Sequence, residues 1–262
     1  MSEQWNTLVV DRYPERFLAR ICLNRPDKMN ALSSEMLEEL GGVFDQLDED
    51  EGIRGVILTG TGERAFAAGA DIGELRGVGK EAGEAKARFG QEIFRKIETF
   101  VKPVIAVVHG YALGGGAELA MACHLRIASE QAQFALPEAS LGLIPGYGGT
   151  QRAVRLIGSA RALEWIWRGS RIDGAKAFEW GLVNHVARSR EEALELAEKL
   201  LSEILRQAPL AVGAVLKCVR LAGDQKGYDR EAVLFGEMCD TEDGREGVEA
   251  FLEKRQAQFR GR

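Results

Sequence analysis

The pattern of apolar and polar residues predicts strands in the first half of the chain. Residues 8–11 and 17–23 alternate at every second position on either side of Pro14, which predicts an antiparallel β-hairpin. Residues 56–59 and 104–108 are short, continuous apolar runs of the kind found in strands buried on both faces. We therefore expect a sheet whose later strands lie in the interior of the protein.

Segments in which the apolar residues have helical spacing lie between these strands and make up most of the second half of the chain. Residues 34–48 and 116–123 are predicted helices, and the second has almost no polar surface. Residues 73–90, rich in Gly, Ala and Lys, are predicted to form a mobile loop that leads into a helix. Further helical spacing recurs at residues 151–157, 160–167, 173–180, 191–207, 210–222 and 245–255.

The order of these elements predicts an α/β fold in two parts. The 262 residues are enough for a sizeable core. We expect an α/β body over residues 1–190, followed by an all-helical segment over residues 191–262.

Composition excludes several classes of function. The net charge of −6 argues against nucleic acid as a partner, because phosphate binding requires a surplus of Lys and Arg. No apolar run approaches the roughly 18 residues of a membrane span. The N-terminus has no targeting pattern, so the chain is predicted to be cytoplasmic or a processed form. Four scattered cysteines predict reduced thiols, and three distant histidines predict no metal site.

Residues 110–138 hold the most informative chemistry. The glycines at 114–116 open the apolar helix, Glu118 lies in its first turn, and Glu138 follows further on. Amides at a helix N-terminus are free to bind negative charge, and the helix dipole favours the anion of Glu118. The layout indicates an oxyanion site that faces an acid/base pair, although a glycine-rich turn with a charge-complementing glutamate is also a common structural feature.

Two further glycine-rich runs lie upstream and downstream of this region. Residues 65–72 read AFAAGADI, where small side chains let a ligand approach the backbone around Gly69. Residues 145–150 read PGYGGT and open another helix. Neither run fits the dinucleotide fingerprint or the P-loop pattern, so both nucleotide-binding folds lose support.

These motifs do not stand alone. In order along the chain, others lie at residues 24–26 (NRP), 30–32 (NAL), 136–138 (LPE), 142–152 (GLIPGYGGTQR), 174–183 (GAKAFEWGLV) and 250–255 (AFLEKR). Together they resemble the crotonase superfamily, and more closely its short-chain enoyl-CoA hydratases, over nearly the whole chain. The resemblance implies a crotonase-like spiral of ββα turns, C-terminal helices that trimerise, and a hexamer built as a dimer of trimers.

The resemblance also implies the site. By matched position, the amides of Ala70 and Gly115 form an oxyanion hole, and Glu118 and Glu138 are the catalytic carboxylates. The positions implied to contact the coenzyme A thioester, which include both oxyanion donors, are Lys28, Met29, Ala31, Ala68, Gly69, Ala70, Asp71, Ile72, Gly115, Pro137, Gly146, Phe235 and Lys254. Lys28 and Lys254 can equally be solvated surface lysines. One departure is visible, because His124 stands where the family usually has Asp.

The implied activity is the reversible addition of water across the double bond of a 2-trans-enoyl-CoA to give (3S)-3-hydroxyacyl-CoA, in fatty-acid β-oxidation or related acyl-CoA breakdown. Our hypothesis is that Glu118 acts as base toward water and Glu138 as acid at Cα, its pKa raised by apolar walls. No cofactor is expected, because coenzyme A is part of the substrate. A Δ3,Δ2-enoyl-CoA isomerase remains an alternative, as does a non-catalytic scaffold or RNA-binding relative, which the acidic balance disfavours.

Overall fold

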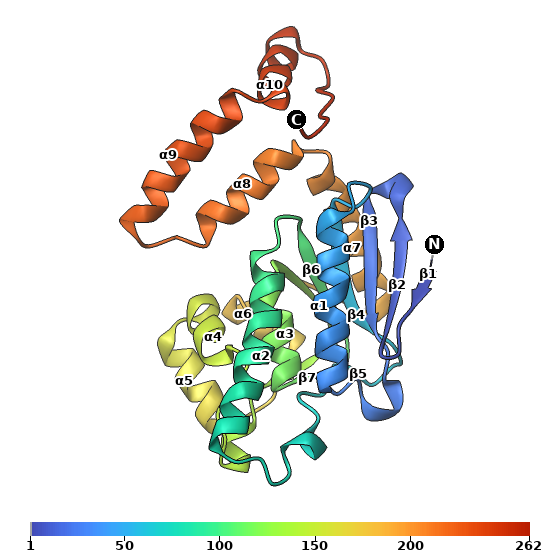
Figure 1. Ribbon diagram of the computed structural model, residues 1–262, viewed down its shortest axis with the longest axis vertical. Helices are drawn as coiled ribbons and strands as arrows, with labels where there is room; N and C mark the ends of the chain where they lie inside the picture. Colours follow the sequence, from blue (N-terminus) through green and yellow to red (C-terminus); the bar gives the residue numbers. More distant parts are fainter. Residues whose placement is uncertain (1) are drawn as a thin grey trace.

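Residues 2–262 are described by a computed structural model, in which they form two β-sheets surrounded by helices (Figure 1). The large sheet contains, in spatial order, β1 (Ser2–Gln4), β2 (Leu8–Tyr13), β3 (Leu18–Leu23), β4 (Gly55–Gly60), β6 (Val104–Val108), β8 (Leu125–Ser129) and β11 (His185–Ala187). The first three strands are antiparallel, which confirms the predicted hairpin, and the strands from β3 to β11 are parallel. The small sheet has the order β10 (Ile172–Asp173), β9 (Gln133–Ala135), β7 (Tyr111–Leu113), β5 (Ala65–Ala67).

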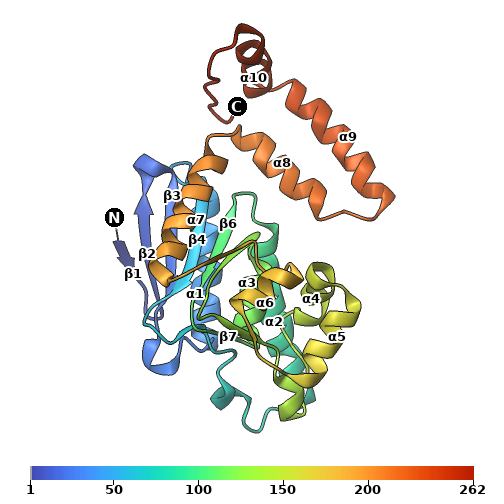
Figure 2. The ribbon, with the colours of Figure 1, turned by 180° about the vertical axis from the view of Figure 1, so that it is seen from behind.

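Both faces of the large sheet are covered, as the continuous apolar runs predicted. The helices of the chain are α1 (Ser34–Glu49), α2 (Lys80–Thr99), α3 (Gly115–Ala122), α4 (Gly149–Ile157), α5 (Ser159–Arg168), α6 (Gly174–Trp180), α7 (Arg190–Leu205), α8 (Pro209–Val219), α9 (Gln225–Cys239) and α10 (Glu242–Glu253). Val56 and Leu58 belong to the main core with α1, whereas Ile57 between them packs with α7 on the opposite face. The two views in Figures 1 and 2 show α1 and α7 on opposite sides of the sheet.

Helix α2 begins at Lys80, so the prediction of a mobile loop over residues 73–90 was wrong. The loop that remains is short, because a 3₁₀ helix, η3 (Ile72–Leu75), precedes it. The first turns of α2 are rich in Ala, Lys and Glu, which are good helix formers, but they bury little and so lack an apolar period. Only from Gly90 onward does the helix present a buried face, formed with Ile93, Phe94 and Ile97.

The small sheet positions the chemistry of the protein. Strands β5, β7 and β9 are parallel neighbours, so their carboxyl ends lie at one edge. The segments that leave this edge carry Ala70, Gly115 and Glu138, the last at the start of a 3₁₀ helix, η4 (Glu138–Leu141). Strands of three residues are too short to show a period, so the pattern of apolar residues did not predict this sheet.

The C-terminal helices α8, α9 and α10 extend away from the sheets (Figures 1 and 2). The expected helical C-terminal segment is therefore confirmed, although α9 was not predicted because it buries only Leu234. Helix α7 lies after the proposed division at residue 190 and packs Ala193, Ala197 and Leu201 against the large sheet. The boundary between the two parts stays a prediction, and this packing favours one after α7.

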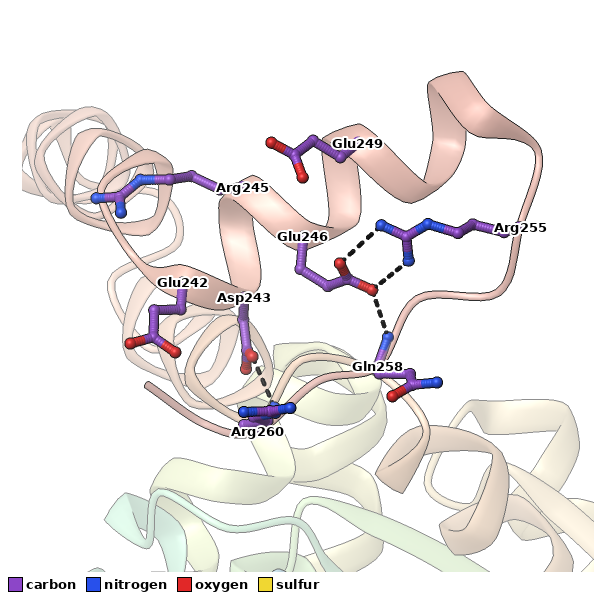
Figure 3. Close-up of a pocket in the computed structure, with 8 residues that line it drawn as sticks. All are labelled: Glu242, Asp243, Arg245, Glu246, Glu249, Arg255, Gln258 and Arg260. Atoms are coloured by element: carbon purple, nitrogen blue, oxygen red, sulfur yellow. Dashed lines mark hydrogen bonds and ion pairs between the residues drawn. The ribbon is translucent and has the colours of Figure 1, made fainter.

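The last residues of the chain fold back on α10 (Figure 3). Glu246 accepts hydrogen bonds from the Arg255 guanidinium at 2.6 Å and from the Gln258 amide at 2.8 Å. Asp243 accepts from the amides of Arg260 and Gly261 at 2.7 and 2.8 Å. These bonds fix residues 255–262 against the helix.

Two absences complete the description of residues 2–262. All four cysteines are free; Cys123 is buried, Cys22 and Cys218 are half-buried, and Cys239 is exposed. Among these residues no helix has the length and apolar character needed to cross a membrane.

Candidate active site

The edge of the small sheet opens into a cavity of about 540 Å³ between α2, α3 and the segment before α4. Nine of the residues expected from the sequence line it: Ala68, Gly69, Ala70, Ile72, Gly115, Glu118, Pro137, Glu138 and Gly146. Both candidate carboxyls and both candidate oxyanion donors are therefore in one cavity. Its other walls are mainly apolar and include Leu75, Val78, Leu141, Leu143, Ile144 and Tyr147.

The amides of Ala70 and Gly115 are close to each other and free. A Cβ placed on Gly115 would lie 3.2 Å from the Ala70 nitrogen. The chain on either side of Ala70 is held by Leu32, which donates to the Gly69 carbonyl at 2.8 Å and accepts from the Asp71 amide at 2.9 Å. Within residues 2–262 neither the Ala70 nor the Gly115 amide has a hydrogen-bond partner. Two unpartnered N–H groups, one of them at the N-terminus of α3, are suited to binding an anionic oxygen.

The run of three glycines is required by close backbone approaches. Gly114 has a φ of 49°, and a Cβ at this position would lie 2.7 Å from Glu138 Oε1. A Cβ at Gly116 would lie 2.0 Å from the carbonyl oxygen of Ala67. Any side chain here would push α3 away from β5 or displace the Glu138 carboxyl.

Glu118 is almost completely buried, with 1 % of its surface exposed. Its Oε1 accepts hydrogen bonds from the amides of Tyr147 at 2.8 Å and Gly149 at 2.6 Å. Burial raises the pKa of Glu118 to about 7, although these amide bonds oppose the shift. Desolvation is the larger effect on this pKa, and the amides that oppose it belong to Tyr147, before α4, and to Gly149, the first residue of α4. The expectation that the dipole of α3 favours the anion stays a prediction.

Glu138 lies opposite, and one of its oxygens, Oε2, is buried without a hydrogen-bond partner among residues 2–262. Burial raises the pKa of Glu138, in the direction that its apolar surroundings predicted. A carboxyl group in this state can hold a proton and deliver it to a bound molecule.

Two polar groups that support the cavity were missed by the sequence analysis. Arg152 is buried, donates to the Tyr147 carbonyl at 2.7 Å and pairs with Glu98 at 2.8 Å. At the rim, Glu74 accepts from the Ser34 hydroxyl at 2.6 Å and pairs with Lys86 at 2.9 Å, so that η3 is tied to α1 and α2. For Arg152 the only signal in the sequence was a charged residue within a helix of otherwise regular apolar spacing, whereas Glu74 and Lys86 lie in the segment predicted as a loop and gave no signal.

Six expected site residues do not line the cavity. Four of them lie just behind it, namely Lys28, Met29, Ala31 and Asp71. The Met29 carbonyl accepts a hydrogen bond from the Ala68 amide at 3.0 Å. The Arg25 guanidinium pairs with Asp71 at 3.1 Å and donates to the Ala31 carbonyl at 2.7 Å. Phe235 on α9 and Lys254 after α10 belong to the C-terminal helices, far from the cavity in the same chain (Figure 1).

His124, the departure from the family pattern, connects β6 to the end of α2. Its Nδ1 accepts a hydrogen bond from the Val104 amide at 3.0 Å, and its Nε2 lies 3.3 Å from the Glu98 carbonyl. Burial lowers the pKa of His124 from 6.5 to about 4, so the folded protein holds the neutral ring.

This burial predicts a loss of stability in mild acid. Below pH 6.5 the unfolded chain binds a proton at His124, whereas the folded chain does not. The contribution of the buried neutral ring to the free energy of unfolding is therefore present above pH 6.5 and declines as the pH falls toward 4. From pH 7 to pH 5 the loss is about 2 kcal/mol in the free energy of unfolding. Urea denaturation of wild type and His124→Gln at both pH values measures it. The exposed His185 provides a control, His185→Gln, and an equal pH dependence in all three proteins would contradict the prediction.

Two free amides and two carboxyls, one buried and one half-buried, in a single cavity are the arrangement of an enzyme that stabilises an oxyanion and moves protons. The family model "Enoyl-CoA hydratase/isomerase" matches residues 15–262, and the chain belongs to this family.

Similar proteins agree with this assignment. A probable enoyl-CoA hydratase of Bacillus subtilis is 44 % identical over 94 % of this chain and 96 % of its own length. A crotonyl-CoA hydratase of Syntrophomonas wolfei is 42 % identical over 94 % of this chain and 95 % of its own. The crystal structure of an enoyl-CoA hydratase from Bacillus anthracis matches with a TM-score of 0.92 and 38 % identity, over 98 % of this chain and all of the other. The crotonase fold is thereby confirmed.

Proposed function

We propose that the protein catalyses the reversible hydration of 2-trans-enoyl-CoA to (3S)-3-hydroxyacyl-CoA. The observation that carries this proposal is the pair of free amides, Ala70 and Gly115, in one cavity with the buried carboxyl of Glu118 and the half-buried carboxyl of Glu138. An isomerase needs one shuttling base, whereas hydration uses two carboxyls. The names of the similar proteins also favour the hydratase.

The four groups divide the reaction between them. The amides of Ala70 and Gly115 bind the thioester oxygen and stabilise the negative charge that develops on it, an effect of about 3 kcal/mol per donor. Ionised Glu118 takes a proton from water while the hydroxide attacks Cβ. Protonated Glu138 gives its proton to Cα, so that one water is added and the two carboxyls have exchanged protonation states. Dehydration follows the same steps in reverse.

The raised pKa values are suited to these roles. With a pKa of about 7, Glu118 is ionised in much of the population at neutral pH and still basic enough to accept a proton from water. Burial holds Glu138 toward its protonated form, as a proton donor requires.

The thioester chain of coenzyme A is proposed to lie along residues 68–72 and the backbone behind them, around Lys28, Met29, Ala31 and Asp71. Coenzyme A arrives as part of the substrate, and the mechanism uses no other cofactor. Relatives named short-chain-enoyl-CoA hydratase and crotonyl-CoA hydratase support a short acyl group. A cytoplasmic location stays a prediction.

The proposed activity is tested by following the absorbance of the conjugated thioester. Addition of the protein to crotonyl-CoA should remove this absorbance, with 3-hydroxybutyryl-CoA as product. A 3-enoyl-CoA supplied as the alternative substrate should gain conjugation slowly or not at all. Faster double-bond migration than hydration would instead identify an isomerase.

We also propose that copies of this chain associate through α8–α10, as a trimer or a dimer of trimers. The outer faces of these helices expose large apolar side chains: Val215, Val219, Tyr228, Val233, Phe235, Val248, Phe251 and Leu252. A surface of this kind is costly to leave in water. Because Phe235 and Lys254 lie far from the cavity of their own chain, the proposal is that they complete the coenzyme A site of a neighbouring copy.

A charge placed on this surface should weaken the assembly. Phe251 is 82 % exposed in the single chain, so Phe251→Glu should fold normally yet dissociate at concentrations where wild type stays associated. Light scattering over a dilution series measures the mass, with Glu249→Gln on the same helix as control. A monomeric, fully active wild-type protein at micromolar concentration would argue against association.

A further inference from the structure

Tyr147 connects the segment before α4 to α2 in a way that the proposed chemistry does not use directly. Its aromatic ring packs edge-on against Phe94, with ring centroids 5.4 Å apart. The ring also fills the space over Gly90, where a Cβ would lie only 2.2 Å from Tyr147 Cδ1. A side chain of any size at position 90 would therefore displace the ring.

The backbone of the same residue holds the candidate base. The Tyr147 amide donates to Glu118 Oε1 at 2.8 Å, and its carbonyl accepts from Arg152 at 2.7 Å. Arg152 is in turn paired with Glu98 near the end of α2.

Helix α2 supports this segment along one face. Gln91 donates to the Gly146 carbonyl at 2.8 Å, one residue before Tyr147. Gly90, Gln91, Phe94 and Glu98 recur at the three- and four-residue spacing of one side of a helix. Three kinds of contact, namely ring packing, a hydrogen bond from the Gln91 side chain and an ion pair, thus fix residues 146–152 against α2.

We infer that α2 positions the Glu118 carboxyl through Tyr147: Gly90 leaves the space for the ring, and the seated ring fixes the amide that binds Glu118. Tyr147 is a positioning residue in this scheme, because it acts on the reaction through Glu118. The kinetic part of the inference rests on the proposed function, whereas its effect on Glu118 does not.

The test is a double-mutant cycle on Gly90 and Tyr147. Gly90→Ala should lower kcat for crotonyl-CoA hydration about 10-fold or more, with KM changed less than threefold, because the methyl group displaces the ring and loosens Glu118. In the Tyr147→Ala background, where no ring is present, the same Gly90→Ala change should cost less than twofold. An equal loss in both backgrounds would overturn the inference.

A second measurement needs no turnover. In protein labelled with ¹³C at the glutamate carboxyls, the Glu118 signal is assigned by its loss in Glu118→Gln and titrated by NMR. Weaker amide bonds should raise the pKa of Glu118 by about one unit in Gly90→Ala relative to wild type. An unchanged titration would overturn the inference even if wild type failed to hydrate crotonyl-CoA, so the two failures are distinguishable.

A matched control separates this effect from a general change in helix stability. Gly42 lies inside α1, and a Cβ there would make an ordinary contact of 3.7 Å with Trp5. Gly42→Ala should leave kcat and the Glu118 titration at wild-type values. If Gly90→Ala does not fold, Gln91→Leu replaces it, because it removes the bond to Gly146 without adding volume over the ring. A wild-type Glu118 titration in that variant would count against positioning by α2.

Discussion

Replacement of Glu118 by Gln should lower kcat for hydration at least ~10²-fold while leaving the affinity for the thioester within a few-fold. The amide oxygen of Gln can still accept from Tyr147 and Gly149, so the segment before α4 keeps its place. Only the capacity to take a proton from water is lost. Steady-state kinetics with crotonyl-CoA and titration with a non-reactive acyl-CoA measure the two quantities.

Glu138→Gln should show a loss of similar size, because proton delivery to Cα is removed. The exposed Glu130, changed to Gln, serves as the control for loss of one carboxylate. Turnover close to wild type in either Glu118→Gln or Glu138→Gln would rule out the two-carboxyl mechanism.

Gly115→Pro should reduce activity by ~10² or more beyond Gly115→Ala, because proline removes the N–H that binds the thioester oxygen. Position 115 is the first residue of α3, where proline is compatible with a helix. Alanine is the matched control, since it retains the N–H and introduces the same Cβ next to the Ala70 nitrogen.

Circular dichroism establishes that both Gly115 variants fold, and kcat/KM for crotonyl-CoA then gives the difference between them. Equal activity of folded Gly115→Pro and Gly115→Ala would exclude this amide as an oxyanion donor.

The parts of the site that were predicted from the sequence depend on local backbone geometry. The three consecutive glycines predict that other atoms approach the backbone more closely than any side chain would permit. Two such approaches are present, by the Glu138 carboxyl at Gly114 and by the Ala67 carbonyl at Gly116. The large sheet was predictable for a similar reason, because its buried strands are continuous apolar runs such as residues 104–108.

The parts that were not predicted depend on residues distant in the sequence. Glu118 and the amides of Tyr147 and Gly149 are about thirty positions apart, so the sequence does not reveal which helix start holds the carboxyl. The direction of its pKa shift depends on burial by the whole fold. Phe235 and Lys254 were expected at the coenzyme A site only from the resemblance, and α9 and α10, to which they belong, extend away from the sheets (Figure 1).

The bonds between the last residues and α10 have a consequence for how the C-terminal helices meet another molecule. The Asp243 amide donates to the Arg262 carbonyl at 3.0 Å, and Gly261 reaches the first turn of α8, where a Cβ on it would lie 3.6 Å from Pro209. The segment thus links the first turn of α10 to the first turn of α8. Helices held to each other in this way lose little conformational freedom on association, so more of the free energy of apolar burial is available for binding.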